Sequence, residues 1–310
     1  MTDGPGHVDA PPRGGTELAG GGLIALASLQ FGMVVVLGKT VLGGGLSTHA
    51  LLAVRFGVAA ALLAAAVLVL RRPLLAAPGE RLRLAALGVA GYGLEAWFFF
   101  AALDRGTAAA TTLLFFTYPV FVALGSWLLG RGAPSRLLVA SLLAAVAGAA
   151  LVVATSGGIA IRPAGVALAL ASSLTFSGYL LGAEGVLDRT DGLTGAVWNS
   201  AFASLGLGLV AWASGGAILP DAAPDRWRLL GMGAATAGAF VCLLSGLRLV
   251  GAVRAAIVSA MEPLAAAVLA ALFLQERISA GTAVGGALIL AGAVAASVAR
   301  ARLPAEPPVP

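Results

Sequence analysis

Long apolar runs separated by short polar breaks make up most of this chain. Ten runs come close to the roughly 20 residues that an α-helix needs to cross a bilayer, and turns such as Arg71-Arg72-Pro73 separate them. Runs such as residues 59–70 are apolar on every face, whereas a β-barrel strand alternates apolar and polar residues. The pattern predicts helices over residues 19–42, 47–70, 82–103, 106–129, 135–155, 164–187, 193–214, 227–249, 251–274 and 280–300.

The composition fits a chain whose solvent is lipid. Of the 310 residues, 59% are hydrophobic and 11% are charged, against about 25% charged in a soluble domain; mean hydropathy is +0.98. We therefore predict an all-α polytopic membrane protein with ten transmembrane helices. The net charge of +5 does not indicate nucleic-acid binding, because the arginines are scattered through the short gaps. One cysteine and two histidines give no disulfide and no zinc site, and no cofactor is expected.

The short loops share their positive charge unevenly. With the N-terminus inside, twelve of the 19 Lys and Arg residues lie on the cytoplasmic side, six lie outside and Arg55 lies within a helix. Positive loops favour the cytoplasm, so both termini are predicted to be cytoplasmic, in a bacterial-type inner (plasma) membrane. Residues 1–18 lack a signal-peptide pattern, and we predict that they form a disordered cytoplasmic tail, with a second tail at residues 301–310.

The chain repeats itself at an offset of 144 residues. Pro119 then coincides with Pro263, and residues 147–149 coincide with residues 291–293. Matching prolines inside helices are informative because each one removes a helical hydrogen bond. Five helices per repeat is an odd number, so the second half must insert upside down, as in transporters that bind solute between inverted halves. The predicted repeats are residues 19–155 and 164–300.

Short motifs recur at the same place in both halves. The first half carries Thr107-Ala108-Ala109 and Tyr118-Pro119, and the second carries Gly251-Ala252, Met261-Glu262-Pro263 and Gln275-Glu276-Arg277. These motifs resemble the EamA repeat of the drug/metabolite transporter superfamily, over about residues 20 to 300. The resemblance implies ten helices, two repeats and export or exchange of small metabolites, and it leaves the substrate open. The first half departs from the pattern, since Gly132 stands where Glu276 stands in the second.

Ionisable residues inside the predicted helices are candidate binding groups, because each costs roughly 2.5–3.5 kcal/mol to insert. Arg55 and Glu95 both lie about 10–12 Å from the outer face, in the second and third helices. We predict that they face one cavity; the alternatives are a structural ion pair or an arginine that reaches out to the surface. Glu262 lies near the midplane before Pro263, where it could bind an amine or a proton, or a neighbouring carbonyl.

Polar and aromatic residues complete the predicted site. Tyr118 is the repeat mate of Glu262, and Tyr92 shares a helix face with Glu95. Asn199 lies where the repeat places the counterpart of Arg55, although it could bridge helices instead. Aromatic rings beside a carboxylate suit a cationic or amphipathic solute. The predicted substrate-binding residues are Arg55, Tyr92, Glu95, Tyr118, Asn199 and Glu262, and the structural or gating residues are Pro119, Pro263 and Glu276.

Together these features predict a secondary transporter that moves a small amino acid-like or drug-like metabolite by alternating access, for export or exchange. No nucleotide-binding loop is present, so a proton or counter-solute is expected to drive it. Helices 1 to 4 and 6 to 9 should line its cavity, with helices 5 and 10 peripheral. The expected partners are a small-molecule substrate and the lipid bilayer, with the chain a monomer or weak homodimer. The alternatives are a channel or scaffold, and an intramembrane enzyme, for which the helices lack the required ligands and nucleophiles.

Overall fold

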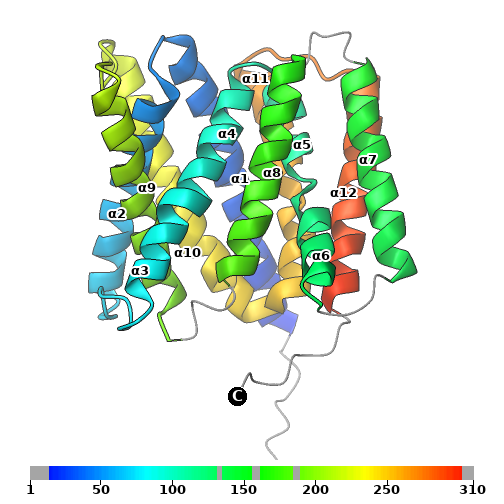
Figure 1. The fold of residues 1–310 in the computed structure, drawn as a ribbon, viewed down its shortest axis with the longest axis horizontal. Helices are drawn as coiled ribbons and strands as arrows, with labels where there is room; N and C mark the ends of the chain where they lie inside the picture. The colour runs from blue at the N-terminus through cyan, green and yellow to red at the C-terminus, as the bar shows by residue number, and fades with distance from the viewer. Residues whose placement is uncertain (1–13, 131–134, 156–160, 184–188, 302–310) are drawn as a thin grey trace, which may run out of the picture.

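The computed structural model describes residues 14–130, 135–155, 161–183 and 189–301. In this part of the chain, seven helical stretches are long and apolar enough to cross a membrane and three shorter helices are also apolar, which confirms the ten-helix membrane fold. The helices stand side by side, and α1 begins and α12 ends at the same end of the bundle (Figure 1). The elements are α1 (Gly14–Gly43), α2 (Thr48–Val69), α3 (Arg81–Ala86), η1 (Leu87–Gly93), α4 (Leu94–Leu103), α5 (Ala108–Phe115), α6 (Tyr118–Leu128), α7 (Arg136–Thr155), α8 (Pro163–Ala183), α9 (Gly192–Ala213), α10 (Ala223–Ser259), α11 (Met261–Phe273) and α12 (Ala280–Ala301).

Proline breaks one helix in each half at equivalent places. The span predicted over residues 106–129 is divided into α5 and α6, because Pro119 has no N–H to donate to the carbonyl of Phe115 and its ring crowds that carbonyl. Pro263 stands in the same relation to Ser259, where α10 ends shortly before α11 begins. The internal repeat is therefore retained in the backbone at both breaks.

Three predicted boundaries are wrong. The helix predicted to end at residue 249 continues as α10 to Ser259, and the helix predicted to begin at residue 251 begins as α11 at Met261. Both differences arise because Gly251 alone costs a helix only about 0.5–1 kcal/mol and the proline that ends α10 lies further on. With 37 residues, α10 is too long to lie straight across a core of roughly 30 Å. The predicted N-terminal tail is also too long, since α1 begins at Gly14 with Glu17 in its first turn, where negative charge is favourable. Residues 1–13 and 302–310 lie outside the described part.

The third predicted span, residues 82–103, changes its helical geometry partway. Between α3 and α4 the chain forms the π-helix η1, which contains three glycines. A Cβ atom on Gly91 would lie 2.8 Å from the Tyr179 ring, and one on Gly88 would lie 3.0 Å from the Asn199 carbonyl oxygen. Because a π-helical turn shifts the direction of the side chains within it and after it, η1 sets the faces on which Tyr92, inside η1, and Glu95, two residues after it, lie.

The main helix packings join the two halves. The pairs in contact are α1 with α10, α4 with α8, α2 with α9, and α7 with α12. The first two pairs exchange under the repeat, as expected for halves related by a two-fold axis. Small residues at four-residue spacing predict close packing, and α7 and α12 have it, because a Cβ atom on Gly148 would lie 2.5 Å from the Gly285 carbonyl oxygen.

Ion pairs fix the loop between α2 and α3 to the start of α9. Asp191, the N-cap of α9, accepts hydrogen bonds from Arg72 at 3.0 and 3.1 Å and from Arg248 at 2.7 Å. Glu80 accepts a hydrogen bond from the backbone N–H of Arg189 at 3.2 Å. Burial opposes ionisation of Asp191, but the hydrogen bonds from Arg248 and Arg72 outweigh it and hold the pKa of this carboxyl below its usual value. This link between the halves therefore depends on an ionised Asp191.

Candidate functional site

A cavity of about 270 Å³ lies between the two halves. Residues of α1, α2, η1, α4, α5, α6, α8, α10 and α11 line it. Within the described residues α7 and α12 supply none, in line with their predicted peripheral place. The prediction for the seventh helix is wrong, because α9 also supplies none. The volume lies near the lower end of the range for ligand sites, so the cavity suits a small solute.

Residues at equivalent positions of the two repeats line this cavity together. Five pairs of lining residues are related by the offset of 144 residues, which places the cavity between equivalent parts of the two halves. Three of the five pairs differ in chemistry, since in two of them a polar residue replaces an apolar one and in the third a carboxylate replaces a phenol, while the other two pairs are apolar in both halves. The pairs are Val35 with Tyr179, Ala96 with Phe240, Phe99 with Leu243, Phe115 with Ser259, and Tyr118 with Glu262.

Arg55 is the cation of the cavity wall and is only 5% exposed. Its Nε atom donates a hydrogen bond to Thr236 Oγ1 at 3.0 Å. Its guanidinium carbon lies 4.7 Å from the ring centre of Phe56 and 5.3 Å from that of Phe100, close enough for a cation–π interaction. Among the described residues no carboxylate pairs with it at salt-bridge distance. The Nη nitrogens therefore remain available to an anionic group of a solute.

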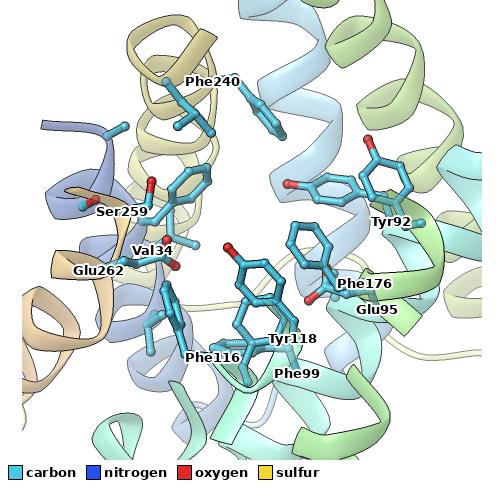
Figure 2. Close-up of a pocket in the computed structure, with 18 of the residues that line it drawn as sticks. Val34, Tyr92, Glu95, Phe99, Phe116, Tyr118, Phe176, Phe240, Ser259 and Glu262 are labelled. Carbon is cyan, nitrogen blue, oxygen red and sulfur yellow. The ribbon is translucent and has the colours of Figure 1, made fainter. Parts of the chain in front are cut away.

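Two carboxylates lie on opposite walls of the same cavity. Figure 2 shows Glu262 on one side and Glu95 on the other, with the Tyr118 hydroxyl between them. Glu95 Oε1 accepts a hydrogen bond from Ser172 at 3.0 Å. Both carboxylates are close enough to Arg55 for their charges to act on it. The wall thus offers one positive and two negative groups.

Aromatic rings along the cavity wall form one continuous series of contacts. Neighbouring ring centres lie 4.9–5.9 Å apart, the spacing of favourable aromatic pairs. Such a surface binds an apolar or aromatic body and also attracts cations to the ring faces. In order around the cavity the rings are Phe115, Tyr118, Phe176, Tyr179, Tyr92, Phe240 and Phe31.

Five of the six residues predicted to bind substrate line this cavity. They are Arg55, Tyr92, Glu95, Tyr118 and Glu262.

The sixth, Asn199, lies behind the wall, where its Nδ2 donates to the Tyr179 hydroxyl at 2.5 Å. Trp97, close to Glu95 in the sequence, stacks on His49 with ring centres 5.6 Å apart and does not line the cavity. Pro119 and Pro263 lie just after the helix breaks. Five of the predicted binding residues thus line one cavity, and Asn199 is separated from it by Tyr179.

Sequence reasoning missed several lining residues, among them Ser28, Phe31, Phe176, Phe240 and Ser259. A phenylalanine or serine is ordinary in a membrane helix, so its residue type carries no signal. Ser259 is the exception, because Pro263 leaves the carbonyl of Ser259 without a helical donor and so marks the position.

Glu276 lies at the end of the bundle where α4 ends and α5 begins. Its two carboxylate oxygens accept from the backbone N–H of Ala108, at 3.1 and 2.9 Å, and Oε1 lies 3.4 Å from Lys39 Nζ. Lys39 also donates to the carbonyls of Leu103, at 3.2 Å, and Gly106. The Glu276 carboxylate thus caps the N-terminus of α5, and the Lys39 ammonium caps the C-terminus of α4. Helix dipoles favour both arrangements. Together they tie α1, α4 and α5 to the loop before α12.

The EamA-like transporter family model matches residues 18–154 and 163–298, one copy in each half. No curated protein matches the chain. Sixteen chains of known structure resemble it. One of them, described only as a protein crystal structure, has a TM-score of 0.66 and 22% sequence identity, over 92% of this chain and 99% of its own. At that identity the likeness supports the fold.

Proposed function

From the premise that the chain belongs to the EamA-like transporter family, we propose that it is a secondary transporter that moves a small amino acid-like or drug-like metabolite by alternating access, for export or exchange. It is an integral membrane protein. The observation that carries the proposal is the cavity between the two halves, which is lined by Arg55 and Glu95 of the first half and by Glu262 of the second. Charged groups inside a membrane protein are costly and usually mark a solute or ion path.

The cavity chemistry favours a solute with both charges and an apolar body. Arg55 would bind a carboxylate, because its guanidinium donates in a planar fork. Glu95 and Glu262 would bind an amine, and Tyr92 and Tyr118 would contact the apolar part. A cavity of about 270 Å³ suits a molecule of amino acid size. Asn199 would not touch the solute itself but would hold the hydroxyl of Tyr179, which lines the cavity.

Transport would proceed by movement of one half against the other around the cavity, as in other inverted-repeat carriers. The proline breaks at Pro119 and Pro263 supply places where α5–α6 and α10–α11 can flex, and Glu276 would close one end. A proton or counter-solute would drive the cycle. The unequal loop charges favour a bacterial-type inner membrane with both termini in the cytoplasm, and the protein would act as a monomer or weak homodimer.

The test is solute uptake into proteoliposomes. A thermal-shift screen with amino acids, amines and carboxylates identifies the solute that stabilises the purified protein most. Arg55→Ala and Glu262→Gln should each abolish saturable uptake of that solute, because each removes a charge of the cavity wall, while the protein stays folded and monodisperse.

Arg136→Ala and Asp104→Asn serve as matched controls, because both side chains are exposed at helix ends and should leave uptake unchanged. Full activity of Arg55→Ala and Glu262→Gln would refute the site. Flux that rises linearly with solute concentration would indicate a channel instead of a carrier.

A further inference from the structure

Two buried hydroxyl groups of the second half hold charged side chains of the first half. Thr236 in α10 and Ser172 in α8 are both 0% exposed, so neither can touch a solute in the cavity. Thr236 Oγ1 accepts from Arg55 Nε at 3.0 Å. Ser172 Oγ donates its one hydrogen to Glu95, where Oε1 at 3.0 Å and the backbone carbonyl oxygen at 3.1 Å share it as acceptors. Each hydroxyl acts on the cavity only through the charged group that it holds.

The hydrogen-bond directions leave each charged group a free side. Thr236 donates its own hydrogen to the carbonyl of Met232 at 2.8 Å, so its oxygen accepts from Arg55 and leaves the Nη nitrogens of that guanidinium for an anion. Ser172 occupies Oε1 of Glu95 and leaves Oε2 for a cation. Both charged groups are therefore fixed on one side and open on the other.

Both bonds cross the interface between the halves, since Arg55 to Thr236 joins α2 to α10 and Glu95 to Ser172 joins α4 to α8. Building on the proposed transport function, we infer that Ser172 and Thr236 are positioning residues: Thr236 orients Arg55 toward the carboxylate of the solute, and Ser172 orients Glu95 toward its amine. Because the partners belong to different halves, the orientation of the two charges depends on how the halves pack.

The test measures KM in proteoliposomes of the full chain for three probes: L-phenylalanine, L-phenylalaninamide, which has only the amine, and 3-phenylpropionate, which has only the carboxylate. Thr236→Val should raise the KM for L-phenylalanine and for 3-phenylpropionate about tenfold, and the KM for L-phenylalaninamide should stay unchanged. Ser172→Ala should raise the KM for L-phenylalanine and for L-phenylalaninamide about tenfold, and the KM for 3-phenylpropionate should stay unchanged. A tenfold change is about 1.4 kcal/mol, close to the lower end expected for a hydrogen bond to a charged group.

Conservative variants and a matched control separate positioning from packing. Thr236→Ser and Ser172→Thr keep the hydroxyl and should restore KM. Ser204→Ala removes another hydroxyl bond that crosses the halves, from Ser204 Oγ to the Ala53 carbonyl at 2.7 Å, but it touches no charged group and should change no KM. A rise that is equal for all three probes, or absent, would overturn the inference.

A second measurement needs no transported solute. The rate of dicyclohexylcarbodiimide labelling at Glu95, measured by mass spectrometry with Glu262 as internal reference, should rise in Ser172→Ala because Oε1 loses its donor. An unchanged rate at Glu95 would also overturn the role of Ser172. If the wild-type protein carries none of the three probes, the solute assigned under the proposed function is wrong, and the labelling result still decides the positioning role of Ser172.

Discussion

Arg55 and Asn199 occupy equivalent positions in the two repeats and contribute differently to the cavity. Arg55 lines it, held by Thr236 and two aromatic rings. Asn199 donates to Tyr179 and keeps a buried Oδ1 without a partner in the described part of the chain. An arginine is long enough to reach the cavity and carries a permanent charge, whereas the short amide stops behind a ring. A symmetric backbone thereby acquires an asymmetric site.

At the residue scale, we predict that Asp191→Asn lowers the melting temperature by a few degrees at pH 7. The variant loses the charge that binds Arg72 and Arg248, and about 1 kcal/mol corresponds to roughly 2–4 °C. The pKa of Asp191 is lowered in the folded protein, so its stabilisation is present above the ordinary aspartate pKa and is lost as pH falls through the folded value.

In thermal unfolding of the detergent-solubilised protein, the melting temperature of Asp191→Asn should therefore lie below that of the wild type at pH 7. This difference in melting temperature should become smaller below about pH 4. Asp104→Asn is the control, because Asp104 is exposed and only loosely paired with Arg105 at 3.9 Å. A gap that stays constant with pH would contradict the ionic origin of the effect.

At the scale of helices, the two prolines interrupt helices, whereas the paired glycines allow two helices to pack closely. Pro119 and Pro263 interrupt helices beside the cavity, where an interruption frees backbone carbonyls and allows bending. Gly148 and Gly285 bring α7 and α12 into backbone contact away from it. The flexible places therefore lie at the cavity, and a tight helix pair lies at the periphery.

We predict that Gly148→Ala destabilises the protein by about 1–3 kcal/mol. The new Cβ atom would lie 2.5 Å from the Gly285 carbonyl oxygen, and backbone cannot move aside cheaply. Gly178→Ala is the matched control, since a Cβ atom there meets nothing within 4 Å. Denaturant-induced unfolding in detergent micelles measures both variants, and equal stabilities would show that α7 and α12 do not need this contact.

For the molecule as a whole, Lys39 and Glu276 lie directly beyond one end of the cavity. Lys39 is four residues, or roughly 6 Å of helix, past Val35, which lines the cavity. Glu276 belongs to the second half, and its bonds reach Lys39 and Ala108 of the first. If the halves move during transport, this cluster must separate whenever that end opens.

We predict that Glu276→Gln makes this end open more often, because the amide keeps the size of the side chain but loses the charge that pairs with Lys39. In a Cys242→Ala background, a Val35→Cys side chain should react at least several-fold faster with a membrane-impermeant maleimide added to intact cells. Asp104→Asn, which lies outside the cluster, should leave the rate unchanged. Equal rates in Glu276→Gln and its parent would contradict a gating role.

The local pattern of the sequence was sufficient for several features of the fold. Apolar length predicts the ten spans, and the offset of 144 residues predicts the matched breaks at Pro119 and Pro263, because helix length and proline geometry act within a few residues. The cost of an ionisable group in lipid singled out Arg55, Glu95 and Glu262, which do line one cavity.

Only the tertiary structure decided which faces of the helices meet. The π-helix η1 changes the direction of the side chains that follow it, and Tyr179 stands between Asn199 and the cavity. Neither feature has a local signal, because the rotation of a helix about its axis follows from the packing of distant segments. For the same reason the hydroxyl partners of Arg55 and Glu95, which come from the other half of the chain, emerged only from the folded molecule.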